Sequence, residues 1–192
     1  MPRWEHGSED RLKQAAMELF EEQGFAHTSA VQIAARARVT TRTFFRYFPD
    51  KQSIVFADDD LLRTALLQRI RDAPDVTQPL EVVTRVLVEF DWEALGPRDS
   101  QRQRDAMITS TPELLERELN KQHQMSDAFG DALRQRGVDP QAAELAARVG
   151  IAVFQTAYRR WLAADDGTDL ATTMAASMST LAVIVPAVIR RR

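Results

Sequence analysis

Apolar residues recur along the chain at the spacing of amphipathic α-helices. The clearest run starts at Leu12 and continues at i+3, i+4, i+7 and i+8 to Phe20, which places one apolar stripe on a single helix face. Gly24 follows, and glycine is common just after the last turn of a helix. The pattern predicts a first helix that ends before Gly24.

Two short helical patterns follow with only a few residues between them. Ser29 precedes the first, and Gln32 completes the arrangement of a capping box three residues later. Thr40 is a second candidate N-cap, for a helix over residues 41–47 that carries phenylalanines on one side. Two short helices joined this closely predict a helix-turn-helix, which must pack on the first helix because it cannot bury a core alone.

The rest of the chain has the pattern of six further helices. The fourth helix begins after Pro49 with no flexible linker before it, so it is expected to tie the preceding helices to the remainder. The six patterns cover approximately residues 50–72, 80–95, 100–109, 112–136, 140–164 and 169–190. The chain is therefore expected to be all-α, with about nine helices.

The helix-turn-helix candidate is basic, although the chain as a whole is acidic. Residues 28–51 hold five basic residues and one acidic residue, a local charge of +4, whereas the whole chain carries −3 at pH 7. A local basic patch indicates a polyanionic partner. The alternative is a solvated basic face on an ordinary helix pair. The basic residues are Arg36, Arg38, Arg42, Arg46 and Lys51.

The same region carries a family signature. From Thr28 to Lys51 the motif is Thr-Ser-x-x-x-Ile-Ala-x-x-Ala-x-Val-Thr-x-x-Thr-Phe-Phe-Arg-Tyr-Phe-Pro-x-Lys, preceded by Ala-x-x-Leu-Phe-x-x-x-Gly-Phe. These motifs resemble the N-terminal signature of the TetR family of one-component bacterial transcriptional regulators. The resemblance implies an all-α homodimer, with a DNA-binding domain over residues 1–50 and an effector-binding and dimerisation domain over residues 51–192.

The second short helix is the expected recognition helix, and double-stranded DNA is the expected partner. Such a helix enters the major groove with its N-terminal residues at base edges. Base contacts are expected from Thr41, Arg42 and Thr43, because the Arg42 fork suits guanine O6 and N7. Phe44 and Phe48 are assigned to the core. Phosphate contacts are expected from Thr28, Arg38, Thr40, Tyr47 and Lys51.

Two positions depart from the family pattern. Phe45 stands where many members carry a tyrosine that hydrogen-bonds phosphate, so only packing against sugar or a base methyl remains there. Arg38 occupies a turn position that is usually glycine. If the turn needs a positive φ, arginine costs on the order of 1 kcal/mol there, which a phosphate contact would offset.

An effector site is expected among the helices of the C-terminal domain. The candidate residues combine aromatic rings, pliable methionines and a few polar groups, which suit an apolar or amphipathic small molecule. Ordinary core packing is the alternative for each of them. The segment Phe-Phe-Arg-Tyr-Phe and the helix from Pro112 also resemble an actinobacterial subgroup that includes acyl-CoA-responsive regulators. The candidates are Phe90, Trp92, Met107, His123, Met125, Phe129, Phe154, Gln155 and Tyr158.

The last two helices are the expected dimer interface. The helix over residues 140–164 is apolar on more than one face, and the final helix is rich in small residues. A helix that is apolar all round must be covered on both sides, here by the core and by a partner subunit. The resemblance implies a four-helix interface with twofold symmetry, which suits two recognition helices about one DNA turn, roughly 34 Å, apart.

Composition and motifs limit the other classes of function. The chain has no cysteine, and neither a metal site nor a cofactor is expected. It has no segment of about 18 apolar residues and no signal-peptide core, so a cytoplasmic protein without a membrane partner is expected. The apolar run Leu181–Ile189 is interpreted as a buried helix end rather than a membrane anchor.

An enzyme is not expected. The three histidines are far apart in the sequence. No nucleophile elbow, phosphate-binding glycine-rich loop or His-Glu-x-x-His motif occurs. The alternatives to a DNA-binding regulator are a small all-α enzyme that uses carboxylates and a helical interaction module that does not bind DNA.

Overall fold

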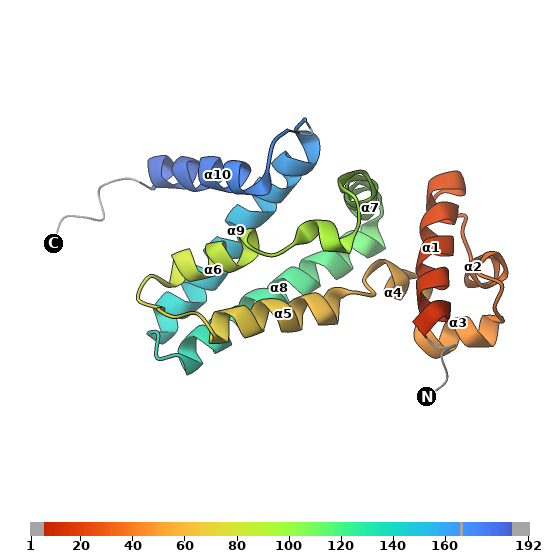
Figure 1. Cartoon of the computed structure of the whole chain (residues 1–192), viewed down its shortest axis with the longest axis horizontal. Coiled ribbons are helices and arrows are strands. Elements are labelled where there is room, and N and C mark those ends of the chain that lie inside the picture. The colour runs from red at the N-terminus through yellow and green to blue at the C-terminus, as the bar shows by residue number, and fades with distance from the viewer. Residues whose placement is uncertain (1–5, 166, 186–192) are drawn as a thin grey trace. The chain divides into compact units, whose positions relative to one another are not determined.

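The structure, a computed structural model, describes residues 6–165 and 167–185. Over these residues the chain forms ten α-helices and one 3-10 helix, and no strand (Figure 1). The all-α prediction is confirmed. The elements are α1 (His6–Gln23), α2 (Ala30–Arg36), α3 (Thr41–Tyr47), α4 (Lys51–Val55), α5 (Asp59–Arg71), α6 (Pro79–Val88), η1 (Trp92–Leu95), α7 (Arg98–Ser110), α8 (Pro112–Gln135), α9 (Pro140–Ala163) and α10 (Leu170–Ile184).

The expected fourth helix is divided into α4 and α5, so the prediction of one continuous helix is wrong. It breaks at Phe56, whose φ of −112° and ψ of 20° are not helical. Asp58 in the break accepts a hydrogen bond from Lys13 Nζ at 2.8 Å. Asp59 and Asp60 then occupy the first turn of α5, where the helix dipole favours negative side chains.

The other predicted helices agree closely with the observed ones, apart from two ends. The expected fifth helix stops at Val88, and its last residues form the 3-10 helix η1. The final helix is described only as far as Ile184. Its predicted extension over residues 186–190 lies outside the described residues.

The chain divides into two compact units. The first contains the residues through Asp60 and the segment Gln103–Leu115, and the second contains Leu61–Arg102 and the described residues from Glu116 on. The first unit therefore extends beyond the boundary expected at residue 50. It also includes a segment from later in the chain.

The first unit has a core of its own beneath α2 and α3. Leu12 from α1, Ile33 from α2 and Phe44 from α3 are completely buried in it. Ile108 and Leu114, from the segment that joins this unit later in the chain, complete the same cluster. This core holds the helix-turn-helix as a rigid pair.

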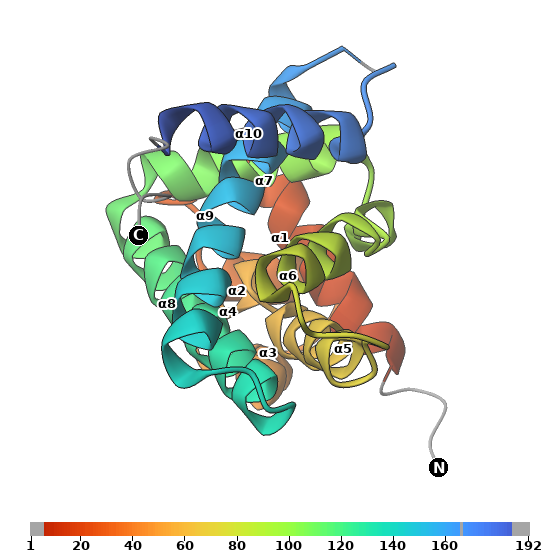
Figure 2. The same ribbon diagram turned by 90° about the vertical axis from the view of Figure 1, so that its left-hand side faces the viewer.

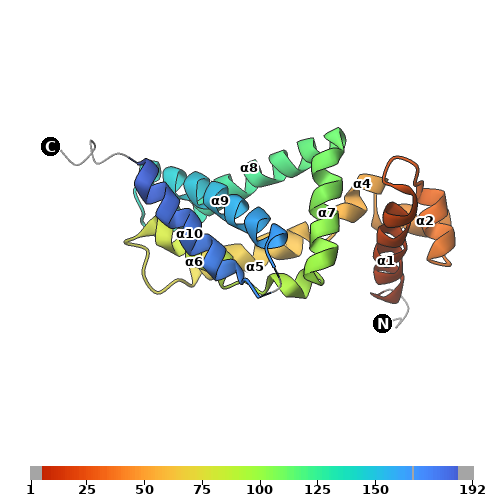
Figure 3. The same cartoon turned by 90° about the horizontal axis from the view of Figure 1, so that it is seen from above.

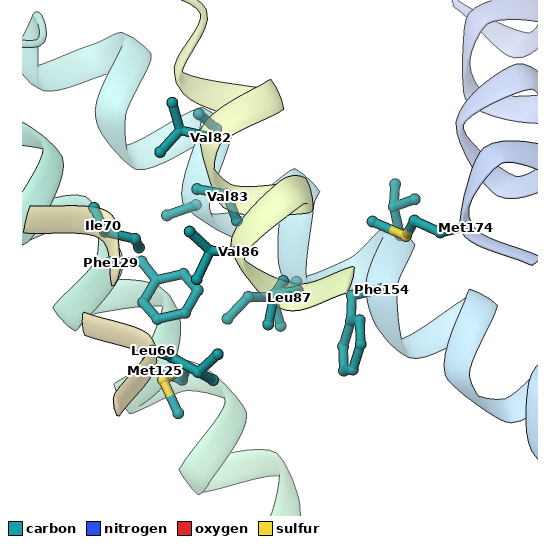
Figure 4. Packing of buried hydrophobic residues seen from close by; sticks show 14 of the residues in the cluster. Leu66, Ile70, Val82, Val83, Val86, Leu87, Met125, Phe129, Phe154 and Met174 are labelled. Atoms are coloured by element: carbon teal, nitrogen blue, oxygen red, sulfur yellow. The ribbon is translucent and has the colours of Figure 1, made fainter. Parts of the chain in front are cut away.

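The second unit is built around α9. Helix α9 packs against both α6 and α10, and Figures 2 and 3 show α10 lying beside it. Side chains from α5, α6 and α8 converge around Phe129, which is completely buried (Figure 4). Gly150 on α9 allows the close approach of α6, because a Cβ at this position would lie 2.4 Å from Cγ1 of Val83.

Arginines satisfy the exposed carbonyl groups at two helix ends in the second unit. Arg98 of α7 donates to the carbonyls of Ala164 at 2.9 Å and Asp165 at 3.1 Å, just after α9. Its guanidinium also lies 4.9 Å from the ring centroid of Trp161. Arg136 caps the end of α5 in the same way, through the carbonyls of residues 70, 71 and 73. The last four carbonyls of a helix lack intrahelical partners, so these arginines replace water as donors.

Candidate nucleic-acid interface

Helix α2 is fixed by a reciprocal capping box. The Ser29 Oγ accepts a hydrogen bond from the Gln32 N–H at 3.2 Å, and the Gln32 Oε1 accepts one from the Ser29 N–H at 2.8 Å. These bonds satisfy donors that the first turn of a helix otherwise leaves unpaired. The predicted capping box is confirmed.

The turn between α2 and α3 passes through a left-handed residue, Arg38, with a φ of 56°. The Val39 N–H donates to the Ala34 carbonyl at 2.9 Å, and the Arg38 N–H donates to the Ala35 carbonyl at 3.1 Å. The turn thus closes α2 in the manner of a left-handed C-terminal cap. The positive φ considered from the sequence is present, and arginine carries its cost of about 1 kcal/mol relative to glycine.

Helix α3 is held by its N-cap and by two buried phenylalanines. The Thr40 Oγ1 accepts a hydrogen bond from the Thr43 N–H at 3.1 Å, as the predicted N-cap role requires. Phe44 and Phe48 are buried, and their ring centroids lie 5.7 Å apart. Their assignment to the core is confirmed, and it determines which face of α3 points outward.

The outward face of α3 presents Arg42, Phe45 and Arg46, which are all exposed. At about 100° per residue, the two arginines point away from the buried Phe44. Among residues 6–165 and 167–185, no carboxylate pairs with Arg38, Arg42 or Arg46. The face is therefore positive and has no internal counterion in the described part of the chain.

Other predicted contact residues border this face. Thr41 and Thr43 are half-buried, and the Thr43 hydroxyl lies 2.9 Å from that of Thr40. Arg46 donates to the Tyr47 hydroxyl at 3.2 Å, and its guanidinium lies 5.0 Å from the centre of the Tyr47 ring. Tyr47 is thus held at the edge of the positive face.

Arg36 does not belong to the positive face, although it was counted in the basic patch. Its guanidinium donates to the two carboxylate oxygens of Glu22 at 2.9 and 2.7 Å, and to Glu18 at 3.3 Å. The hydrogen bonds from Arg36 lower the pKa of the Glu22 carboxyl. The sequence did not indicate this pairing, because Arg36 and Glu22 lie on different helices and meet only when α1 and α2 pack.

Thr28 is buried, and its hydroxyl is bonded within the protein, so the structure gives no support to its predicted phosphate contact. It is 3% exposed. Its hydroxyl donates to the Gly24 carbonyl at 2.9 Å and accepts a hydrogen bond from Gln23 Nε2 at 3.1 Å. Thr28 instead closes the connection between α1 and α2.

Lys51 is also engaged with this connection. Its Nζ donates to the Phe25 carbonyl at 2.6 Å and lies 4.0 Å from the centre of the Phe25 ring. Burial lowers the pKa of the Lys51 ammonium. Lys51 therefore has a structural role, and a phosphate that it binds would share the ammonium group with the Phe25 carbonyl.

The effector candidates of the second unit include a continuous aromatic cluster. Ring centroids lie 5.0 Å apart for Phe90 and Trp92, 4.8 Å for Trp92 and Phe154, and 5.6 Å for Phe154 and Tyr158. Trp161 extends the cluster at 5.5 Å from Tyr158. The structure therefore brings four of the nine predicted effector residues together.

A buried glutamine lies beside this cluster, and the sequence did not single it out. Gln101 is buried, and its Nε2 donates to the Trp92 and Gly96 carbonyls, both at 2.7 Å. Its Oε1 accepts a hydrogen bond from the Tyr158 hydroxyl at 2.5 Å. Gln101 lies in a stretch predicted only as a polar helix, because its partners are distant in the sequence.

The remaining effector candidates are dispersed. Met125 and Phe129 lie in the same core as the aromatic cluster (Figure 4), and Gln155 is half-buried. Met107 instead packs against the core of the first unit. His123 is exposed on α8, and its Nε2 lies 3.4 Å from an Asp127 carboxylate oxygen. Met107 and His123 are therefore not part of the predicted cluster.

The end of α10 exposes apolar side chains in the single chain. Val183 is 83% exposed, and Ile184, Val185 and Leu145 of α9 are also exposed. Within the single chain, Leu181 is half-buried against the core, whereas residues 182–185 are exposed, so the interpretation of this run as a buried helix end holds only for its start. Residues 186–189 of the run lie outside the description. None of the described helices combines the length and apolar character needed to span a bilayer.

Family models match both the N-terminal and the C-terminal part of the sequence. Residues 12–57 match the family described as "Bacterial regulatory proteins, tetR family", and residues 77–186 match the "MftR C-terminal domain". The chain is 35% identical over 75 residues to the HTH-type transcriptional regulator TcmR of Streptomyces glaucescens. This match covers 39% of the chain and 33% of TcmR, so it spans about a third of the relative's length.

Solved structures show the same fold over nearly the whole chain. NalD, the secondary repressor of the MexAB-OprM multidrug efflux pump in Pseudomonas aeruginosa, superposes with a TM-score of 0.64 at 21% identity, over 92% of this chain and 95% of NalD. SmeT, the repressor of the Stenotrophomonas maltophilia multidrug efflux pump SmeDEF, gives 0.59 at 20% identity, over 91% and 89%. At these identities the likeness concerns the fold.

Proposed function

The chain belongs to the TetR family of bacterial regulatory proteins. We propose that it is a cytoplasmic transcriptional regulator that binds operator DNA. It binds a palindromic operator as a homodimer, and a small molecule changes its affinity for that operator. Repression is the output to test first. The observation that carries the proposal is the positive face of α3, where Arg42 and Arg46 have no carboxylate partner within the described residues.

The operator is read by α3 in the major groove. Arg42 contacts a guanine, because its guanidinium can donate to both O6 and N7. Thr41 and Thr43 make shorter base contacts beside it. Arg38, Thr40, Tyr47 and Lys51 position the helix on the phosphates. The support for this assignment is that α3 is capped, anchored by two phenylalanines and positively charged on its outward side.

The dimer forms through α9 and α10. Support comes from the large apolar side chains Leu145, Val183 and Ile184, which these two helices leave exposed in the single chain and which a partner subunit would cover. A self-complementary pair of helices gives twofold symmetry. Twofold symmetry in turn matches a palindromic operator.

The effector is an apolar or amphipathic small molecule bound in the second unit, and acyl-CoA thioesters are one class to test. The aromatic cluster from Phe90 to Tyr158, with Met125, supplies apolar and polarisable surface. Gln101 and the Tyr158 hydroxyl supply polar groups beside it. Met107 and His123 are left out of this proposed site because they lie elsewhere.

Ligand and operator are coupled through the two conformations that they select. A molecule that prefers the DNA-incompetent conformation lowers operator affinity, and operator DNA lowers the affinity for that molecule by the same factor. A titration of each in the presence of the other therefore distinguishes an effector from a molecule that merely binds.

The experiment that tests the function is selection of genomic fragments by the full chain, followed by titration of the recovered sequence. A regulator yields a palindrome whose binding weakens steeply with salt. Its binding weakens on Arg42→Ala, and its preference at one base pair of each half-site relaxes. Recovery of no preferred sequence would instead favour a helical enzyme or an interaction module that does not bind DNA.

A further inference from the structure

Phe45 is an exposed aromatic residue on a helix that otherwise presents positive charge. It exposes 53% of its surface, whereas its neighbour Phe44 is completely buried. The two rings meet edge to face, with centroids 5.2 Å apart and planes at 83°. This contact orients the Phe45 ring on the surface, so a partner that meets the ring pays little ordering entropy.

The position of Phe45 on α3 relates it to Arg42. Phe45 lies three positions after Arg42, and at about 100° per residue the two side chains point about 60° apart around the helix axis. Arg46, the next residue, is exposed on the same side. A partner that meets the two guanidinium groups therefore also meets the Phe45 ring.

The charge of this surface limits the chemistry of that partner. Arg42 and Arg46 have no carboxylate partner in the described part of the chain, so the surface suits a polyanion. The polyanion must also offer an apolar group to the ring. The major groove of DNA offers one such group on its base edges, the C5 methyl of thymine.

A phosphate contact does not explain Phe45, because a phenyl ring has no hydrogen-bond donor. A sugar contact would use the ring but would be insensitive to the base. We propose that Phe45 reads a thymine C5 methyl, at a base pair next to the one that Arg42 contacts. This inference rests on the proposed function, in which α3 binds operator DNA.

The test uses the full chain and the duplex recovered by the genomic selection. Each thymine is replaced in turn by deoxyuridine, which lacks only the C5 methyl group. We expect one position in each half-site at which this replacement weakens wild-type binding roughly three- to tenfold, the size expected for losing one buried methyl. At that position Phe45→Ala binds the thymine and uracil duplexes equally.

Three further variants separate the methyl contact from general effects. Phe45→Tyr keeps the ring and is expected to keep the sensitivity to uracil. Phe45→Leu keeps an apolar side chain and is expected to keep part of it, so it carries the test if Phe45→Ala does not fold. Leu61→Ala removes an exposed apolar side chain outside α3 and is expected to respond to uracil as the wild type does.

The outcomes distinguish this inference from the function on which it rests. A palindrome that is bound equally with thymine and uracil at every position overturns the inference and leaves the function standing. A uracil effect that persists in Phe45→Ala assigns the methyl to another residue, and a uniform weakening by Phe45→Ala without a uracil effect indicates a sugar contact. Both results overturn the inference. Failure to recover any preferred sequence overturns the proposed function as well.

Discussion

Gly150 of α9 lies directly against Val83 of α6. A Cβ at residue 150 would lie 2.4 Å from Val83 Cγ1, a distance that requires backbone or side-chain movement. Both residues are buried within the second unit, so any such movement has to displace neighbouring core side chains. The close approach of α6 and α9 therefore depends on the absence of a side chain at residue 150.

We predict that Gly150→Ala destabilises the protein by about 1–3 kcal/mol through overpacking. Urea unfolding at fixed protein concentration measures the change. Val83→Ala removes the clashing methyl and should recover part of the loss in the double variant. Gly130→Ala is the matched control in α8, where the nearest atom is the end of the flexible Arg134 side chain at 3.4 Å. If Gly150→Ala is no less stable than Gly130→Ala, the packing argument is wrong.

Arg38→Gly is expected to stabilise the fold by about 1 kcal/mol, because glycine tolerates the φ of 56°. It should also weaken operator binding, since one phosphate contact is lost. The slope of log affinity against log salt concentration should become shallower by about 1. Thermal unfolding and gel-shift titrations at several salt concentrations measure these two effects. Arg38→Asn also removes the charge and should weaken binding similarly. Unchanged operator affinity in both variants would remove the phosphate contact.

Arg42→Ala should weaken operator binding by about 1–3 kcal/mol and relax the preference at one base pair of each half-site. Arg36→Ala is the comparison, because it removes the same charge from a residue that is already paired with Glu22. It should change operator affinity much less. Titrations against the operator and single-base variants measure both. Equal losses in the two variants would show that total charge, rather than the position of Arg42, controls binding.

Arg98→Lys should lower the free energy of unfolding by about 1–3 kcal/mol, because one ammonium group cannot replace a guanidinium that bonds several carbonyls. Arg160→Ala, at an exposed position of α9, should change it by no more than about 0.5 kcal/mol. Urea unfolding of both variants gives the comparison. A neutral Arg98→Lys would mean that water serves these carbonyls equally well.

The N-cap of α10 should make stability depend on pH in the acid range. Hydrogen bonds from the Thr172 side chain and N–H lower the pKa of the Asp169 carboxyl below its ordinary value of 3.8. The contribution of the Asp169 carboxylate to the free energy of unfolding is therefore fully present above pH 3.8. It is lost as the pH falls through the lower pKa of the folded state. Asp169→Asn keeps an oxygen acceptor but does not titrate there. The difference in unfolding free energy between the two proteins should shrink below about pH 4, and a constant difference would contradict this role.

Local patterns predicted the helix-turn-helix well, whereas contacts between distant residues were not predicted. The caps at Ser29 and Thr40 depend on residues three positions away, so the sequence contains their partners side by side. Lys51 pairs with the Phe25 carbonyl, and Gln101 with Tyr158, 57 residues away. Such partners meet only after the helices pack, and a backbone carbonyl carries no residue-specific signal.

The same reasoning applies to the effector site. Aromatic residues at helical spacing predicted Phe90, Trp92, Phe154 and Tyr158 as a group, and the structure places their rings in contact. Residue type alone also selected His123, which is exposed. The face of a helix that a polar residue occupies depends on how the helix is rotated against its neighbours, and this rotation is decided by packing.

The arginine cap on α9 has a consequence for how the sequence can vary. Arg98 bonds the main-chain oxygens of Ala164, Asp165 and Thr168, and every amino acid supplies that oxygen. The side chains at these three positions can therefore drift among relatives without loss of the contact, whereas the arginine itself cannot. The connection after α9 can therefore tolerate changes of sequence at these three positions, because a single arginine in α7 holds its main chain.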